Sequence, residues 1–208
     1  MTVIGACMLW VGWFGFNAGS ALAANGDAGM AMLVTHIGAA AGSLAWMAME
    51  WLRFGKPSVL GIVTGMVAGL GTITPASGFV GPAGALLIGL TAGVVCFWAT
   101  QVVKRVFEID DSLDVFPVHG IGGFLGVFMT AFLANRLGGQ GFLSESITTS
   151  GAQFVEQLIG ACAIAVWCGL VSFALFKIID AVVGLRVSEE EETEGLDLTQ
   201  HDERGYNL

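Results

Sequence analysis

The middle of the chain reads PSVLGIVTGMVAGLGTITPASGFVGPAGALLIGLTAGVVCFWATQVV, residues 57–103, and contains no charged residue. A helix needs about 20 apolar residues to cross the hydrocarbon core of a membrane, so this run is long enough for two crossings. Residues 75–82 interrupt the run with two prolines and two glycines, which favour a turn. The pattern therefore predicts membrane helices over residues 58–77 and 82–103.

Four more stretches on either side have the same apolar character, at residues 2–24, 28–49, 115–134 and 153–176. The whole chain is 55% hydrophobic and 12% charged, which is too apolar for one water-soluble domain. The first stretch has no basic start and is too long for a cleavable signal, so it is interpreted as a span. The sequence predicts an all-α fold, a polytopic bundle of six transmembrane helices.

The basic residues predict how this bundle is oriented. Seven of the eight Lys and Arg residues follow the second, fourth or sixth span, and only Arg136 lies in an opposite loop. Lys and Arg gather in the cytoplasmic loops of membrane proteins. We therefore expect a multi-pass protein of the cell membrane with both ends of this chain in the cytoplasm.

The last 22 residues differ from the rest in charge. Residues 187–208 hold eight acids and one base, whereas residues 1–186 hold nine acids and seven bases. We interpret these parts as a transmembrane domain, 1–186, and an acidic cytoplasmic tail, 187–208, either a plain solubilising segment or one that orders only against a partner. No basic face for nucleic acid can be assembled from so few cations.

The cysteines and glycines are both interpreted as packing residues. Four cysteines lie in apolar runs without a CxxC or Cys/His cluster, so neither a metal site nor a cofactor is predicted. Glycines repeat every four residues, which lets membrane helices approach closely. A tight bundle without a large extramembrane part favours a channel or transporter over an enzyme. The repeats are Gly61/Gly65/Gly69, Gly15/Gly19, Gly89/Gly93 and Gly122/Gly126.

The first span carries a face that suits a small cation. Trp13, Phe16 and Ser20 follow one another at helical spacing, with Asn17 beside them. Aromatic rings attract a cation, and a hydroxyl oxygen accepts its N–H proton. The plainer interpretation is that the rings pack against helices or lipid, but polar side chains in a span usually face protein or a water-filled cavity.

His119 is the second candidate for a functional residue. The preceding residues predict a helix start, with Asp114 as the cap and Pro117 in the first turn. A neutral imidazole accepts a proton at one nitrogen and donates at the other, so it suits a path for an amine or its proton. A structural interhelical histidine is equally consistent. A start at the membrane surface would leave His119 only about 7 Å deep.

Three other polar residues receive plainer interpretations. His36 in the second span is interpreted as an interhelical hydrogen-bonding residue, and His201 as a solvated tail residue. Glu156 enters the sixth span, and its role stays open.

Three segments carry a resemblance to a known family: GWFGFNAGSA at residues 12–21, DVFPVHGIGG at 114–123 and GLRVSEEEETEGLD at 184–197. In this order they resemble the ammonium transporter family, Amt/Mep/Rh, and bacterial Amt proteins in particular. The loops GKPS at 55–58 and TPASG at 74–78 are similar to family loops.

The resemblance implies a homotrimer with one narrow pore in each subunit. The family fold has eleven spans in two inverted five-helix halves plus a last helix, and this sequence resembles spans six to eleven. The first half, with a partner histidine, a second gate phenylalanine and an outer tryptophan, is not in this sequence. We therefore expect half of that fold, which is a fragment or works with a missing half.

The resemblance also implies roles for single residues. Ser20 matches the outer recruitment hydroxyl, Phe16 a gate phenylalanine, Trp13 a pore-wall tryptophan and His119 one of two paired pore histidines. Asp111 and Asp114 match acids at the cytoplasmic end of the histidine helix. Lys56 and the tail match parts that meet a PII-type signal protein.

The resulting hypothesis is transport of ammonium or ammonia across the membrane, with deprotonation as the ion enters a dry pore. The main alternative is an ammonium sensor that signals through its tail. An enzyme that uses His119 as an acid/base or metal ligand would need a second inward-facing ligand or carboxylate, and the sequence offers none at suitable spacing.

Overall fold

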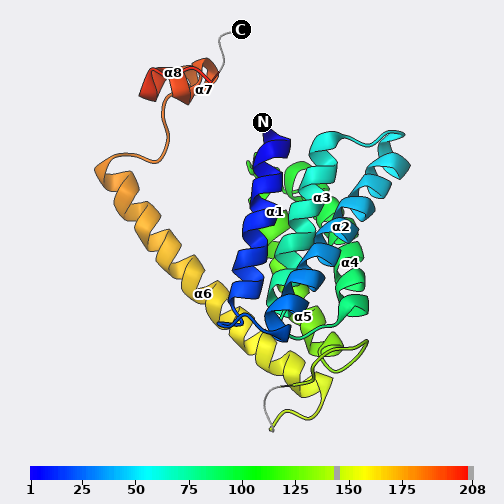
Figure 1. The fold of residues 1–208 in the computed structure, drawn as a ribbon. Coiled ribbons are helices and arrows are strands. Elements are labelled where there is room, and N and C mark those ends of the chain that lie inside the picture. The colour runs from blue at the N-terminus through cyan, green and yellow to red at the C-terminus, as the bar shows by residue number, and fades with distance from the viewer. Residues whose placement is uncertain (143–145, 206–208) are drawn as a thin grey trace. The chain divides into compact units, whose positions relative to one another are not determined.

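The computed structural model describes residues 1–142 and 146–205, and every regular element in these ranges is a helix. The chain divides into two compact units, Met1–Ile159 and Gly160–Leu208, which are described separately. The first unit contains α1 (Thr2–Gly19), α2 (Gly26–Phe54), α3 (Val59–Ile73), the short 3-10 helix η1 (Thr74–Ala76), α4 (Pro82–Arg105), the π-helix η2 (Phe116–Ile121), α5 (Gly122–Leu133) and the start of α6 (Ser150–Val182). Figure 1 shows α1 to α5 side by side as a bundle.

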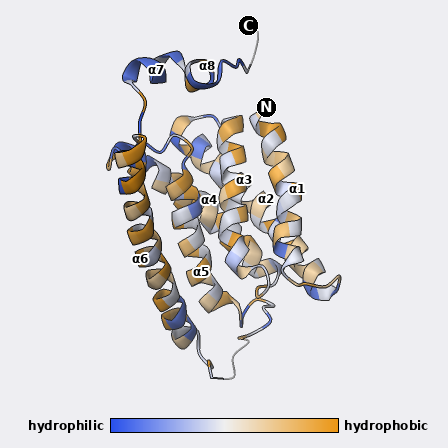
Figure 2. Cartoon of the chain, turned by 90° about the vertical axis from the view of Figure 1, so that its left-hand side faces the viewer, coloured by the Kyte–Doolittle hydropathy of each residue, from blue (hydrophilic) through white to orange (hydrophobic). Residues whose placement is uncertain are grey.

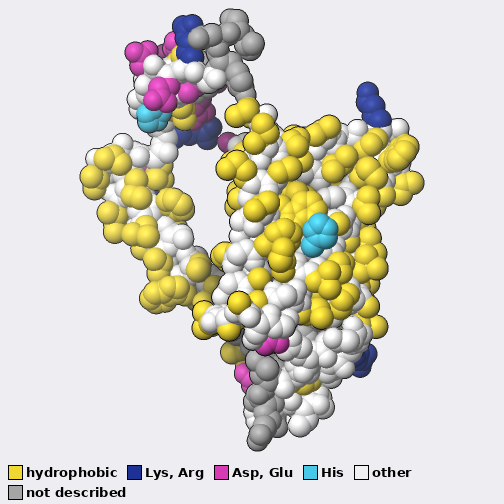
Figure 3. Space-filling model, in the orientation of Figure 1, with side chains coloured by type: hydrophobic (Ala, Val, Ile, Leu, Met, Phe, Trp, Pro, Cys, Tyr) yellow, Lys and Arg dark blue, Asp and Glu magenta, His cyan; other side chains and the backbone are white. Residues whose placement is uncertain are grey.

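Six helices in the described ranges are long and apolar enough to cross a membrane, as the sequence predicts. Figure 2 shows hydrophobic residues along these helices, and hydrophobic side chains cover much of the bundle surface in Figure 3. At one end of the bundle, the Arg53 guanidinium lies over the Trp98 ring, 5.6 Å from its centroid. This arrangement is typical of aromatic and basic residues that anchor a helix at the membrane surface.

Local sequence signals explain where the helices begin and end. The Asn25 side chain accepts a hydrogen bond from Ala28 N at the start of α2, and Ser58 does the same for Gly61 N at the start of α3. Gly55 ends α2 in the left-handed conformation that glycine adopts without strain. The helix α1 ends at Gly19, five residues before the predicted end, because the chain turns through residues 20–25 to reach the Asn25 cap.

The core lies where α2 packs between α3 and α4. A Cβ on Gly93 of α4 would lie 2.6 Å from Gly42 O, and one on Gly65 of α3 would lie 2.7 Å from the same oxygen. Real Cβ atoms do not approach this closely, so these positions require glycine. The predicted packing role is confirmed for three of the four repeats. For Gly15 and Gly19 it stays a prediction, because a Cβ there would meet nothing within 4 Å among the described atoms.

Buried side chains fill the space above and below these glycine contacts. Val34, Ile73 and Ile88 form one cluster, each with no exposed surface. Trp46 packs edge-on against Phe97, with ring centroids 5.6 Å apart, in a second cluster. Such close packing supplies van der Waals attraction, which drives helix association in lipid where the hydrophobic effect cannot.

The second unit contains the rest of α6 and two short helices, α7 (Glu189–Glu194) and α8 (Leu196–His201). The sequence predicts the helix over residues 153–176 but none in the tail, where Ser188 and Glu191 form a capping box that starts α7. The Ser188 backbone N–H and hydroxyl donate to Glu191 and lower the pKa of that carboxyl. Hydrogen bonds from Arg186 likewise lower the pKa of Glu192.

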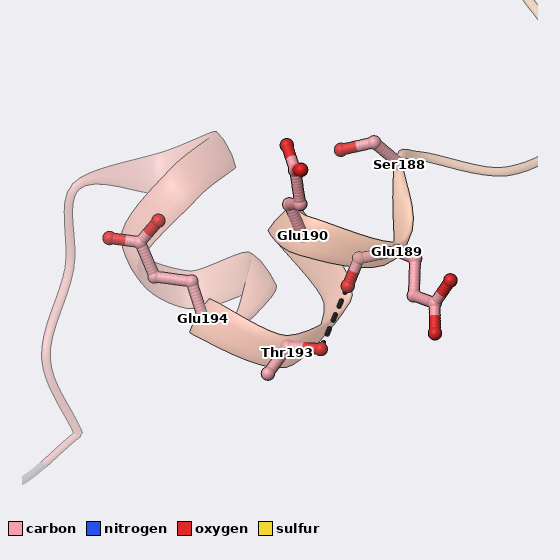
Figure 4. A pocket seen from close by; sticks show the side chains of 5 residues that line it. All are labelled: Ser188, Glu189, Glu190, Thr193 and Glu194. Atoms are coloured by element: carbon pink, nitrogen blue, oxygen red, sulfur yellow. Dashed lines mark hydrogen bonds between the residues drawn. The ribbon is translucent and has the colours of Figure 1, made fainter.

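Figure 4 shows the surface of α7, where the side chains of Glu189, Glu190 and Glu194 point in different directions. The Thr193 hydroxyl donates to the Glu189 carbonyl oxygen over 2.8 Å, within the helix itself. The hollow along this helix is lined by these four residues and Ser188.

Candidate functional site

The predicted face of α1 exists, and it is tied to the end of α3. Trp13 Nε1 donates a hydrogen bond of 2.8 Å to Thr74 Oγ1, at the first residue of η1. The Trp13 and Phe16 rings lie 6.0 Å apart at 59°. Trp13 is half-buried, whereas Phe16 is 65% exposed. The hydrogen bond therefore fixes one ring while the other projects from the bundle.

Ser20 and Asn17 have different surroundings, although they share the same end of α1. Ser20 is exposed, and its hydroxyl donates to the Phe16 carbonyl oxygen over 3.0 Å. Asn17 is 4% exposed and donates to Thr35 Oγ1 of α2 over 2.9 Å. Asn17 thus connects two helices, and Ser20 is the hydroxyl that faces outward with Phe16.

A cavity of about 330 Å³ lies at this end of the bundle. Phe16 and Ser20 line it together with Thr74. The carboxylate-bearing Asp27 from the first turn of α2 and Gln140 from the loop after α5 also line it. The sequence did not indicate these last two residues, because their approach to Ser20 depends on how α2 and the loop fold back. The remaining lining residues are Asn17, Ala21, Ala31, Ser77, Gly78 and Phe79.

The helix that carries His119 begins with a carboxylate cap, but the cap is Asp111. Its two oxygens accept hydrogen bonds from Val115 N at 2.9 Å and Phe116 N at 2.8 Å. The expectation of Asp114 as the cap is wrong, because Asp114 has a positive φ of 56° and pairs with Lys104 Nζ at 2.8 Å. Pro117 lies in the first turn as predicted.

His119 lies in a π-helix, a widened turn that is frequently found at functional sites. A Cβ placed on Gly71 would lie 3.9 Å from His119 Nδ1, so the imidazole is beside α3. Gly71 is twelve residues after the first residue of α3, which is about 18 Å along that helix. His119 therefore lies beside the last turn of α3, far from the first residue of that helix.

The helix α3 connects the two parts of the predicted site. Thr74, which holds Trp13, follows Gly71, which adjoins His119, by three residues or about 5 Å along the axis. The structure thus brings Phe16 and Ser20 together at one cavity, connects Trp13 to the cavity-lining Thr74, and puts His119 next to α3. His119, like Phe16 and Ser20, is exposed on the described surface.

Other predicted residues lie apart from this face. Lys56 is exposed in the loop between α2 and α3, at the same end of the bundle as the N-terminus (Figure 1). His36 packs beside the Trp10 ring at 5.1 Å and the Phe14 ring at 6.0 Å. Glu156 is exposed near the start of α6.

Comparisons with known proteins agree with these observations. The sequence model of the Ammonium Transporter Family matches residues 1–206. Ammonium transporter Amt1 of Archaeoglobus fulgidus is 48% identical over 208 residues, covering 99% of this chain and 52% of that protein. The ammonium transporter of Bacillus subtilis is 41% identical over 212 residues, covering 99% and 51%. These two relatives are named as transporters and not as enzymes, in agreement with the sequence-based prediction.

Solved structures give the same result. A "Sensor Amt Protein" matches with a TM-score of 0.88 and 30% identity over 96% of this chain and 48% of that one. Saccharomyces cerevisiae Mep2 matches with a TM-score of 0.78 and 34% identity over 91% and 44%. The chain spans about half the length of the relatives that it matches. It is a multi-pass membrane protein, and it belongs to the ammonium transporter family.

Proposed function

We propose that this chain supplies one wall of a narrow, His119-lined path that carries ammonium or ammonia across the cell membrane. The observation that carries the proposal is the role of α3, which holds Trp13 through Thr74 and adjoins His119 at Gly71. Residues from α1 and η2 that are far apart in sequence thereby border one face. The names of the relatives support ammonium as the substrate.

The cavity beside Ser20 would attract the ammonium ion. The Asp27 carboxylate contributes negative charge, the Ser20 hydroxyl oxygen accepts an N–H, and the exposed Phe16 ring presents its face to a cation. These groups favour the charged form at the entrance.

The ion would lose its proton as it leaves this cavity. Desolvation disfavours a charged amine, in the same way as burial lowers the pKa of a lysine. The neutral molecule would then pass His119, whose imidazole both donates and accepts a hydrogen bond. Sodium and potassium ions have no proton to lose and no replacement for their hydration along an apolar wall, so the path would exclude them.

The exposed position of these residues supports a path completed by more protein. Phe16 and His119 are exposed on the described surface, and the chain spans about half the length of its relatives. We infer that the remainder of a complete family fold covers this face and that the complete protein forms a homotrimer. We also infer that the loop containing Lys56 and the end of α4 that carries Lys104 face the cytoplasm.

Substitution of His119 tests the proposal. Uptake of ammonium and ammonium-dependent current should be measured for the full-length protein in liposomes. His119→Ala should change uptake or its coupling to protons, and the melting temperature of each variant shows whether it is folded. His36→Ala is the matched control, since His36 is a second exposed histidine that packs against Trp10 instead of Gly71. Unaltered uptake and current in His119→Ala would contradict the assigned role.

A second candidate is an ammonium sensor that signals through its tail. The similarity to a "Sensor Amt Protein" and the ordered helices α7 and α8 favour it. A PII-type partner would meet the tail and the loop that contains Lys56. Deletion of residues 187–208 separates the two functions: loss of partner binding with full uptake supports regulation by the tail, whereas loss of uptake alone argues against a separate signalling role.

A further inference from the structure

The turn between α2 and α3 is held by the carboxylate of Glu50, which lies near the end of α2. Glu50 Oε2 accepts a hydrogen bond from Ser58 N over 2.6 Å, and Glu50 Oε1 accepts one from Ser58 Oγ over 3.0 Å. Ser58 Oγ in turn accepts a hydrogen bond from Gly61 N over 2.8 Å at the start of α3. A carboxylate of one helix therefore fixes the residue that caps the next helix.

The first turn of α3 leaves room for this carboxylate. A Cβ on Gly61 would overlap Glu50 Oε1, so this position requires glycine as long as Glu50 keeps its place. Glu50 is half-buried and Gly61 is buried. Neither residue lines the cavity beside Ser20, so the proposed entry of ammonium does not explain the arrangement.

The backbone of the turn is restricted on both sides of Lys56. Gly55 ends α2 in the left-handed conformation, and the ring of Pro57 fixes its own φ. Ser58 is tied to Glu50 by its backbone and its side chain. Lys56 itself is exposed. The turn is therefore a rigid support for one exposed cation.

We propose that Glu50 is a positioning residue, which holds Lys56 in place for a carboxylate on a cytoplasmic partner protein. This inference rests on the second candidate function, in which a partner meets the loop that contains Lys56. A flexible turn would lose conformational freedom on binding, at a free-energy cost that a preorganised turn avoids. Glu50 thus favours binding, although its own negative charge opposes an acidic partner.

The test measures the Kd of the full-length protein in detergent for the purified PII-type signal protein of the same organism. Glu50→Ala removes both hydrogen-bond acceptors and should raise the Kd about fivefold, because the turn is then ordered only on binding. Glu50→Gln removes the same charge, but it keeps an oxygen for Ser58 N and an amide that donates to Ser58 Oγ. Its Kd should stay within about twofold of the wild-type value. Loss of charge alone would instead lower the Kd of both variants equally.

Substitution of Lys56 connects the effect of Glu50 to the exposed cation. In a double-mutant cycle, Glu50→Ala should change the Kd by less than about twofold once Lys56 is replaced by alanine, because the turn then has no cation to position.

Ser58→Ala tests the same clamp without a change at Glu50, in case Glu50→Ala does not fold. It keeps the backbone N–H that donates to Glu50 but loses the hydroxyl, so it should raise the Kd about twofold. The matched control is Ser43→Ala, because Ser43 is a serine of α2 whose hydroxyl donates to Ala39 O, and its Kd should not change. Ammonium uptake, measured in parallel, shows that each variant is folded.

Two results would overturn the inference while leaving partner binding itself intact. One is an equal change of Kd in Glu50→Ala and Glu50→Gln, which would show an effect of charge. The other is an undiminished effect of Glu50→Ala in the Lys56→Ala background, which would show that Glu50 does not act through Lys56. If the wild-type protein takes up ammonium but does not bind the PII-type protein, the second candidate function fails, and this inference fails with it.

Discussion

The two sides of α3 show opposite uses of small residues. On the side toward α2, Gly65 and Gly69 lie so close to the neighbouring backbone that any side chain would clash. On the other side, a Cβ on Gly71 would come no closer than 3.9 Å to η2, and a few hydrogen bonds such as Trp13 to Thr74 hold the neighbouring segments. The closed side fixes where α3 lies, and the open side can therefore carry exposed aromatic and polar groups without loss of the fold.

Alanine substitution on the closed side should have the largest effect. A Cβ on Gly42 would lie 2.9 Å from Gly69 Cα and closer still to Gly65 O, so Gly42→Ala must separate two helices. Overpacking of this kind costs about 3 kcal/mol in stability. Chemical denaturation of the purified protein in detergent measures this loss.

The same substitution at Gly15 gives the matched comparison. A Cβ there would meet nothing within 4 Å, so Gly15→Ala should leave the free energy of unfolding within about 0.5 kcal/mol of the wild type. Equal losses for Gly42→Ala and Gly15→Ala would show that the close contact between α2 and α3 does not explain the difference.

Removal of the Asp111 cap, at the start of the helix that carries His119, should cause the next largest loss of stability. Asp111→Ala removes a carboxylate that accepts two backbone hydrogen bonds, at 2.9 and 2.8 Å, and such a loss costs about 2 kcal/mol. Asp114→Asn removes only a partly exposed ion pair with Lys104, worth about 0.5 kcal/mol, and asparagine tolerates the positive φ. The two unfolding free energies, measured side by side, should differ in this order. A greater loss for Asp114→Asn would contradict Asp111 as the cap.

Much of the fold could be predicted from the sequence, because hydrophobic runs of membrane length are long and unambiguous. The boundaries of α3 and α4 agree with the prediction to within a few residues. The tail helices α7 and α8 are not predicted from the acidic composition of the tail. The signal for α7 is local, the capping box that Ser188 forms with Glu191. The early end of α1 was also missed, since hydropathy continues through residues 20–24 while the chain already turns toward Asn25.

The candidate site could be predicted from the sequence only for residues that lie on the same helix. Helical spacing predicts that Trp13, Phe16 and Ser20 lie on one face of the first span, and these residues do lie near the same end of α1. The approach of Asp27, and the position of Gly71 beside His119, depend on contacts between helices that periodicity does not contain. The cap was assigned to Asp114 because it is nearer to the helix, whereas the loop geometry lets Asp111 reach both N–H groups.

Loss of the hydrogen bond from Trp13 to Thr74 should lower the stability of the protein by a smaller amount. Trp13→Phe removes the Nε1 donor to Thr74 and should lower stability by about 1 kcal/mol. Trp10→Phe is the control on the same helix, because Trp10 Nε1 is buried without a hydrogen-bond partner among the described residues. Its substitution should cost less. A double-mutant cycle with Thr74→Val would isolate the bond, and an interaction energy near zero would show that Trp13 is held by packing alone.

The smallest effect should come from Asp27 at the mouth of the cavity. A cation in water about 6 Å from a carboxylate gains about 0.7 kcal/mol, so Asp27→Asn should raise the KM for ammonium about threefold and leave kcat unchanged. Because salt screens such an interaction, the difference should disappear at high ionic strength. Glu156→Gln makes the same change in net charge at an exposed residue that does not line the cavity, and it should have no effect on KM. If both substitutions raise KM equally, the general field of the protein attracts the ion, and the cavity then contributes aromatic and hydroxyl contacts without a local charge.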